Sequence, residues 1–267
     1  MSMEVHRRLI AYSTANGWAA TPHVTYTYEP DVTKFMEVYE GMREGFLAQH
    51  GQRLTLNTLM LKVLAEGIKL APRMNASLDM PRDIDPTNYD GTLTTHESIE
   101  AAVPSHLPSG ATLSLTVHDC GNKSLAELTE MNADQQRRAQ ATDFDSLYQR
   151  MIAATLTGEV VNVEGQLNPA DMLGGTITIS NIGSISNAPG QFNLLDVIAP
   201  QTTAIGISAL QRVPRVCVVD GEEQILPRSV IPICIAFDHR AMGFYDIVPF
   251  INRLEEIFAE PEVIRSW

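Results

Sequence analysis

Two segments of this chain carry side chains that could act on a substrate, and the first contains a histidine. The apolar stretch 230–237 runs directly into Asp238 and then His239. A histidine at the end of a strand can hold one ring nitrogen against the backbone and present the other to a cavity, as a general base must. Taken alone, a single histidine after a strand more often has a structural or surface role.

The second segment, 174–184, places a small hydroxyl group at the end of a strand. Thr and Ile alternate through TITIS, so that Ser180 and Asn181 lead into a glycine-containing turn. Hydroxyl and amide groups in such a turn can donate hydrogen bonds to an oxyanion. An ordinary strand followed by an Asx or Ser turn has the same sequence, and that interpretation is favoured for the segment in isolation.

Other chemistries lack their usual sequence patterns. The histidines are scattered and the HEXXH, HxH and EF-hand spacings are absent, so we expect no metal site. The dinucleotide-binding, P-loop and GxSxG patterns are also missing. Three widely spaced cysteines without a CxxC pair indicate no disulfide framework and a cytoplasmic, reducing location.

Composition narrows the classes of partner. The 267 residues include 19 Lys and Arg against 32 Asp and Glu, which gives a net charge of −13 and argues against a nucleic-acid-binding protein. Hydrophobic residues make up 44% of the chain and charged residues 19%, as in an ordinary folded protein. No run of about 18 apolar residues is present, so we expect no membrane span.

Hydrophobic periodicity predicts an α/β (α+β) protein in which helices pack on a large mixed sheet. The predicted helices are 4–15, 32–51, 54–74, 124–156 and 247–260. The predicted strands are 22–32, several short runs between 75 and 120 separated by turns at 81–91 and 106–110, and a series from 176 to 237. A loop is expected at 158–175.

Local signals add detail to the helices. The pair Asn16-Gly17 predicts the end of the first helix, and Gly51 predicts the end of the second. Helix 54–74 has more apolar positions than 32–51 and should be more buried, whereas 124–156 is charged and should cover the surface. Pro249 should lie in the first turn of the last helix because an interior proline lacks the required N–H.

The two chemical segments form part of an ordered series that extends over nearly the whole chain. The series comprises Arg7-Arg8, TPHVT (21–25), MNASLD (74–79), KSLAEL (123–128), NPADMLGGTITISNIGS (168–184), IAPQTTAIGIS (198–208), VVDGEE (218–223) and FDHR (237–240). This series resembles the catalytic domain of the dihydrolipoamide acyltransferases, the core components of 2-oxo-acid dehydrogenase complexes. The resemblance implies a single acyltransferase domain over 1–267 with a chloramphenicol-acetyltransferase-like two-layer sandwich fold.

The resemblance also implies an activity, which is acyl transfer between the thiols of coenzyme A and a dihydrolipoyl group. His239 takes the position of the family base that removes the thiol proton, and Ser180 that of the hydroxyl that binds the oxyanion. In the family the site lies between the subunits of a trimer, so we expect a homotrimer or a larger assembly built from trimers. A thiol of pKa about 8.5 is mostly protonated at neutral pH, so a neutral imidazole is a suitable proton acceptor.

The chain departs from the family motif HxxxDG, in which Asn sometimes replaces Asp. Gly243 and Phe244 stand at the last two motif positions. Three interpretations follow: an acyltransferase with an altered pocket, a non-catalytic trimeric core or interaction protein, and a thioester hydrolase. Asp246 could replace the lost carboxylate, but its position at a helix start favours a role as a helix N-terminal residue.

The remaining expectations concern substrate delivery and two single residues. The chain starts near the first catalytic-domain helix, so we expect no lipoyl or peripheral subunit-binding domain. The acyl acceptor is then a lipoyl group on a separate protein or a small free molecule. His23 is interpreted as a histidine on an exposed strand face, with channel lining as the alternative, and Cys120 as a structural cysteine.

Overall fold

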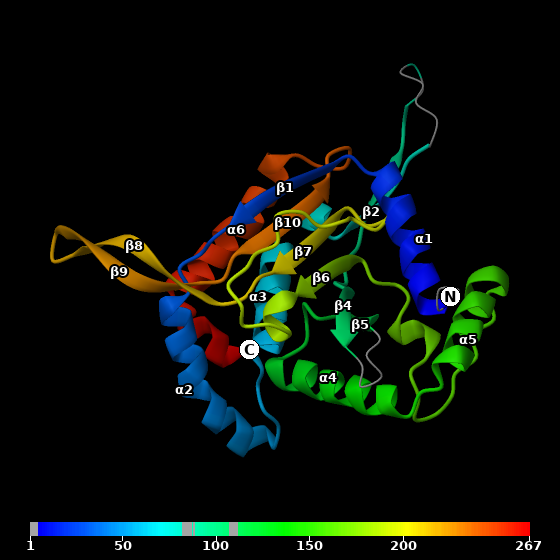
Figure 1. The fold of residues 1–267 in the computed structure, drawn as a ribbon, viewed down its shortest axis with the longest axis horizontal. Coiled ribbons are helices and arrows are strands. Elements are labelled where there is room, and N and C mark those ends of the chain that lie inside the picture. The colour runs from blue at the N-terminus through cyan, green and yellow to red at the C-terminus, as the bar shows by residue number, and fades with distance from the viewer. Residues whose placement is uncertain (1–4, 82–86, 88, 107–111) are drawn as a thin grey trace.

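The computed structural model describes residues 5–81, 87, 89–106 and 112–267. Its main feature is a six-stranded mixed sheet in the order β1-β10-β7-β6-β4-β5 (Figure 1). The strands are β1 His23–Tyr28, β4 Ala101–His106, β5 Thr112–Val117, β6 Ile177–Asn181, β7 Thr203–Ile207 and β10 Ile233–Asp238. Strand β6 is parallel to both β7 and β4, and the other neighbouring pairs are antiparallel.

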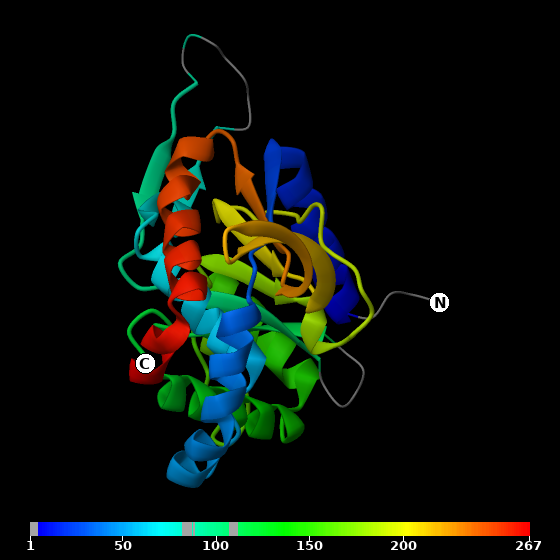
Figure 2. The same ribbon diagram turned by 90° about the vertical axis from the view of Figure 1, so that its left-hand side faces the viewer.

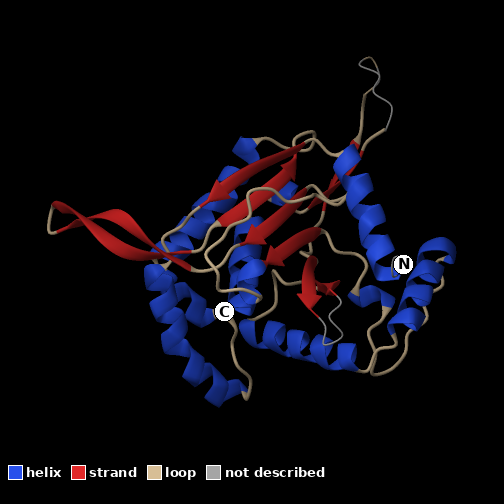
Figure 3. Cartoon of the chain, in the orientation of Figure 1, coloured by secondary structure: helices blue, strands red, loops and turns tan. Residues whose placement is uncertain are grey.

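Two antiparallel hairpins accompany the sheet. They pair β2 Ala76–Asp79 with β3 Thr92–Thr95, and β8 Gln211–Val219 with β9 Glu222–Val230. The β8–β9 hairpin projects away from the rest of the chain, as Figure 3 shows. The expected turns at 81–91 and 106–110 fall mostly outside the described residues.

Six α-helices among the described residues surround the sheet. They are α1 Val5–Ala20, α2 Thr33–His50, α3 Leu56–Ile68, α4 Leu125–Gln140, α5 Phe144–Thr157 and α6 Phe244–Ala259. Helices α3 and α6 contribute to the largest apolar cluster, together with side chains from one face of the sheet. Helix α1 lies on the opposite side of the sheet from α6 (Figure 2). None of the described helices is long and apolar enough to cross a membrane.

Helix α3 is more buried than α2, as the sequence predicted, and it packs closely on α6. A Cβ atom added to Gly67 would lie 2.5 Å from Leu254 Cδ1 and 2.7 Å from Phe250 Cδ2. Both of these side chains are fully buried, so neither has room to move away. Gly67 is therefore required for the close approach of the two helices.

This packing predicts that Gly67→Ala lowers the free energy of unfolding by about 1–3 kcal/mol, because the added methyl group overpacks a closed interface. Gly45 in α2 provides the matched control, since no atom lies within 4 Å of its added Cβ. Gly45→Ala should raise the free energy of unfolding by about 0.5–1 kcal/mol through helix propensity. Urea denaturation measures both, and equal effects of the same sign would contradict this account of the α3–α6 contact.

Three helix predictions differ from the structure. Helix α1 continues through Asn16-Gly17 to Ala20, because Gly17 serves as a close contact with the Val197 carbonyl rather than as a C-terminal stop. The stretch 124–156 forms two helices, because the Asp143 carboxylate accepts hydrogen bonds from the first backbone N–H groups of α5. Helix α6 starts at Phe244, so Pro249 lies in its second turn.

The interpretation of 124–156 as a surface helix was correct only in part. Gln135 is buried, and its side-chain amide donates to the Thr116 carbonyl. Arg138 forms a two-pronged ion pair with Asp171, at 2.6 and 2.8 Å, that ties α4 to the loop 158–175. The polar residues of this helix therefore hold the loop that precedes β6.

Asp171→Asn should lower the free energy of unfolding by about 2 kcal/mol at neutral pH, because the negative charge that pairs with the Arg138 guanidinium is lost. Burial alone raises the pKa of Asp171, but the hydrogen bonds from Arg138 and the Asn168 N–H, together with the positive charge of Arg138, outweigh it and hold that pKa below its usual value. The stabilisation is thus complete above about pH 4 and declines as the pH falls toward the lowered pKa. Urea denaturation of both proteins from pH 7 to pH 3 should show a constant difference that shrinks only below about pH 4.

Candidate active site

His239 follows the last residue of β10, and its ring is oriented by the backbone. The His239 N–H donates to the Pro22 carbonyl at 3.1 Å, and Nδ1 lies 3.0 Å from the Met242 carbonyl oxygen. A carbonyl can only accept a hydrogen bond, so Nδ1 carries the proton in the neutral ring. Nε2 then has a free lone pair and can accept a proton from a substrate.

The turn after β10 is held by its own polar groups. Asp238 is almost fully buried, and its carboxylate accepts hydrogen bonds from the Arg240 guanidinium at 2.6 to 3.2 Å. This pairing raises the pKa of Arg240, so the charge persists at any accessible pH. The N–H groups of Ala241 and Met242 both donate to the Asp238 carbonyl. The position of the Met242 carbonyl, which orients His239, therefore follows from the buried Asp238.

The two residues that differ from the HxxxDG motif, Gly243 and Phe244, lie at the start of α6. Gly243 has an extended backbone, with φ −118°, and its N–H donates to Asp246 Oδ2 at 2.8 Å. The interpretation of Asp246 as a helix N-terminal residue is therefore confirmed. Phe244 packs edge-on against Phe237, with ring centroids 5.5 Å apart, and lies 6.4 Å from the His239 ring.

Ser180 lies in β6, on the opposite face of the sheet from the buried Ile177 and Ile179. The residue is half-buried, and no hydrogen bond of its hydroxyl is found within the described part of the chain. The neighbouring Asn181 is used locally: its Nδ2 donates to Asn57 Oδ1 at 2.8 Å, and its Oδ1 accepts from the Ser184 N–H. Of the two candidate donors, Asn181 thus has hydrogen-bond partners for its side chain, whereas the Ser180 hydroxyl has none among the described residues.

The sheet keeps Ser180 and His239 of one chain apart. Ser180 is level with Gly206 of β7, and Gly206 is level with Cys234 of β10. His239 lies five residues beyond Cys234, which corresponds to about 16 Å along the strand at about 3.3 Å per residue. The two side chains therefore cannot contact the same reacting carbonyl within one chain.

Two other residues singled out in the sequence have structural roles. His23 is not a free histidine on an exposed strand face, because its Nε2 accepts the Val197 N–H at 2.9 Å and its ring stacks on Trp18. Cys120 is fully buried, and burial raises the pKa of its thiol to about 12. The interpretation of Cys120 as a structural cysteine is confirmed.

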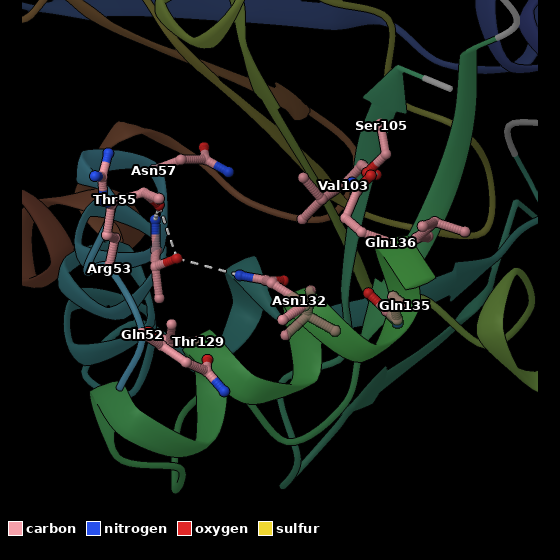
Figure 4. A pocket seen from close by; sticks show the side chains of 14 residues that line it. Gln52, Arg53, Thr55, Asn57, Val103, Ser105, Thr129, Asn132, Gln135 and Gln136 are labelled. Atoms are coloured by element: carbon pink, nitrogen blue, oxygen red, sulfur yellow. Dashed lines mark hydrogen bonds between the residues drawn. The ribbon is translucent and has the colours of Figure 1, made fainter. Parts of the chain in front are cut away.

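A separate cavity of about 450 Å³ lies between the start of α3, helix α4 and strands β4 and β5 (Figure 4). Amide side chains, including Asn57, Asn132 and Gln136, line it together with Arg53. Neither Ser180 nor His239 is part of the lining. Its residues come from four distant segments, so the sequence contained no local signal for it.

Comparison with known proteins identifies the family. The model of the 2-oxoacid dehydrogenases acyltransferase family (catalytic domain) matches residues 1–147 and 151–265. The chain therefore belongs to this family, and the resemblance inferred from its sequence is confirmed.

Two curated relatives show the range of the family. The dihydrolipoyllysine-residue acetyltransferase component of the pyruvate dehydrogenase complex of Mycobacterium tuberculosis is 30% identical over 255 residues, covering 94% of this chain and 40% of the relative. The dihydrolipoyllysine-residue succinyltransferase component of the 2-oxoglutarate dehydrogenase complex of Haemophilus influenzae is 23% identical, covering 96% of this chain and 52% of the relative. The chain thus spans only about half or less of these relatives.

Solved structures share the fold. Dihydrolipoamide acetyltransferase of Azotobacter vinelandii matches with a TM-score of 0.74 at 23% identity, over 99% of this chain and 92% of that one. A probable dihydrolipoamide acetyltransferase of Listeria monocytogenes gives 0.73 at 18% identity, over 97% and 94%. The Azotobacter work concerned the catalytic roles of a serine, a histidine and an asparagine four residues after that histidine. These likenesses confirm the predicted mixed-sheet fold.

Proposed function

We propose that this chain catalyses coenzyme-A-dependent acyl transfer between a coenzyme A thioester and the thiol of a dihydrolipoyl-type or other small acceptor. The observation that carries the proposal is the orientation of His239. Its Nδ1–H is held by the Met242 carbonyl, so Nε2 remains available to accept a proton. The relatives' activities, named for dihydrolipoyllysine acetyl and succinyl transfer, belong to the same reaction class.

The chain provides a proton acceptor and an oxyanion donor for the proposed reaction. Nε2 of His239 takes the proton of the acceptor thiol as its sulfur attacks the thioester carbonyl, and the carbonyl π electrons move onto oxygen. The Ser180 hydroxyl donates a hydrogen bond to that oxyanion. The intermediate then collapses, the bond to the coenzyme A sulfur breaks, and the imidazolium returns its proton to the departing thiolate. No residue is acylated in this scheme.

The separation of Ser180 and His239 supports a site formed between copies of the chain. Since about 16 Å along the sheet divides them in one chain, His239 of one copy must face Ser180 of another if both act on one carbonyl. We propose a homotrimer in which three such interfaces close a ring, the arrangement that the family resemblance implies. The lipoyl group would reach the site on a carrier protein.

The competing proposal is a non-catalytic trimeric core or interaction protein. Gly243 favours it, because the asparagine studied in the Azotobacter relative also stands four residues after its histidine and this chain has no side chain there. The orientation of His239 favours catalysis, because its Nδ1 contact leaves Nε2 as a proton acceptor with no hydrogen-bond partner among the described residues. We therefore place acyl transfer first.

A thiol-release assay distinguishes these functions. Purified protein is incubated with acetyl-, propionyl- and longer acyl-coenzyme A, with and without dihydrolipoamide, and coenzyme A is quantified. Release that depends on dihydrolipoamide supports acyl transfer. Release without any acceptor indicates thioester hydrolysis, and no release from any donor by a trimeric sample contradicts the proposed function and favours the scaffold.

A further inference from the structure

Position 243 is a glycine in this chain, whereas the family motif has Asp or Asn there. The backbone of Gly243 is extended, which any residue can adopt, and no atom lies within 4 Å of an added Cβ. The chain geometry therefore does not require glycine. This chain has space for the Asp or Asn side chain of the motif.

The next residue, Phe244, brings an aromatic ring to the same place. Its centroid lies 5.5 Å from that of Phe237 at 89° and 6.5 Å from that of Tyr26 at 73°. These are edge-to-face contacts in the favoured range. Phe237 is completely buried in the main apolar cluster, so the Phe244 ring rests on a rigid support.

The His239 ring lies beside both phenylalanines. Its centroid is 5.8 Å from that of Phe237 at 81° and 6.4 Å from that of Phe244 at 71°. The Nδ1 hydrogen bond fixes one point of the imidazole, but a single hydrogen bond allows the ring to rock about it. Edge-on neighbours limit that movement, because rocking drives the ring edge into their carbon atoms.

We propose that Phe244 is a positioning residue for His239, which limits the movement of the imidazole by packing where position 243 provides no side chain. The proposal rests on the proposed function in naming His239 as the base. A purely structural role explains the ring less well, since Phe244 is 49% exposed and is not a member of the main apolar cluster. Tyr245, the next residue, is 90% exposed and makes no ring contact within the described chain, which makes it the matched control.

Steady-state kinetics provide the first test. Phe244→Gly should lower kcat by between about ten- and a hundredfold, with KM for the acyl donor within about twofold, because a misplaced base slows chemistry without weakening binding. Tyr245→Ala should leave kcat unchanged. The double variant Gly243→Asn, Phe244→Gly should regain most of the lost kcat by restoring the side chain at 243. An unchanged kcat in Phe244→Gly overturns the proposal, and so does a failed rescue.

A second readout does not depend on turnover. In protein labelled with ¹⁵N-histidine, with His239→Gln used for assignment, the wild-type ring nitrogens should report one neutral tautomer, protonated at Nδ1. Phe244→Gly, or Phe244→Leu if the glycine variant does not fold, should show a mixture of tautomers or exchange broadening. If no donor turns over, the proposed function fails, and an unchanged spectrum in the folded variant separately overturns the role of Phe244.

Discussion

We expect His239→Ala to lower kcat for the proposed acyl transfer by between about a hundred- and ten-thousandfold, the usual contribution of a positioned general base. In the variant the acceptor thiol must lose its proton to water, and a thiol of pKa about 8.5 is mostly protonated at neutral pH. The imidazole is exposed and its hydrogen bond joins only the turn after β10, so the fold should remain intact. The thiol-release assay with dihydrolipoamide measures the loss.

His50→Ala is the matched control for this variant. His50 is exposed in the last turn of α2, and its ring contact is with Phe46, far from the turn after β10. Its removal should leave kcat unchanged. Equal rates for wild type and His239→Ala would show that this histidine is not the base, and they would favour the interpretation of the protein as a non-catalytic core.

We expect Ser180→Ala to lower kcat by between about a hundred- and a thousandfold, the loss found when one donor to an oxyanion is removed. The hydroxyl contacts the oxygen only after negative charge develops, so KM for the acyl donor should change little. The free state of the Ser180 hydroxyl in the described chain agrees with such a role, because no internal hydrogen bond competes for it. Initial rates over a range of acyl-coenzyme A concentrations separate kcat from KM.

Ser184→Ala is the control for the serine variant. Its hydroxyl donates to the Asn181 carbonyl within the turn, so its loss removes a hydroxyl nearby without removing an oxyanion donor. A raised KM with unchanged kcat in Ser180→Ala would contradict the assigned role, since that pattern reports lost binding of the ground state.

Much of the fold follows from local sequence signals. Helix α2 ends where Gly51 adopts φ 67°, which a glycine C-cap allows, and helix α4 starts at the capping box of Ser124 and Glu127. Strand β10 follows from its continuous apolar run, since both of its faces are covered. These features depend on residues only a few positions apart, so they can be recognised in the sequence.

The features that the sequence did not predict depend on contacts between distant segments. The pair Asn16-Gly17 predicts a helix stop, because the contact of Gly17 with the Val197 carbonyl cannot be inferred from neighbouring residues. The polar sequence around Gln135 predicts a surface position, and nothing near it in the chain indicates its partner, the Thr116 carbonyl of β5. Asp143 did offer a local signal, since an acidic residue ahead of a new apolar repeat is a typical helix start.

The candidate site also combines features that local sequence reveals with features that depend on distant segments. The types of His239 and Ser180 and their neighbouring motifs could be recognised in the sequence. The carbonyl that orients His239 belongs to Met242, and a backbone group has no sequence signature. The distance between the two residues depends on the order and direction of β6, β7 and β10, which only the folded sheet provides.

If His239 and Ser180 act together across an interface between copies of the chain, two inactive variants should complement each other in mixed trimers. Trimers assembled by co-expression of equal amounts of His239→Ala and Ser180→Ala chains contain interfaces that join an intact histidine to an intact serine. We predict roughly a quarter of wild-type turnover, since random assembly gives about one such interface in four. Turnover no higher than that of the separate variants, in confirmed mixed trimers, would contradict the shared site.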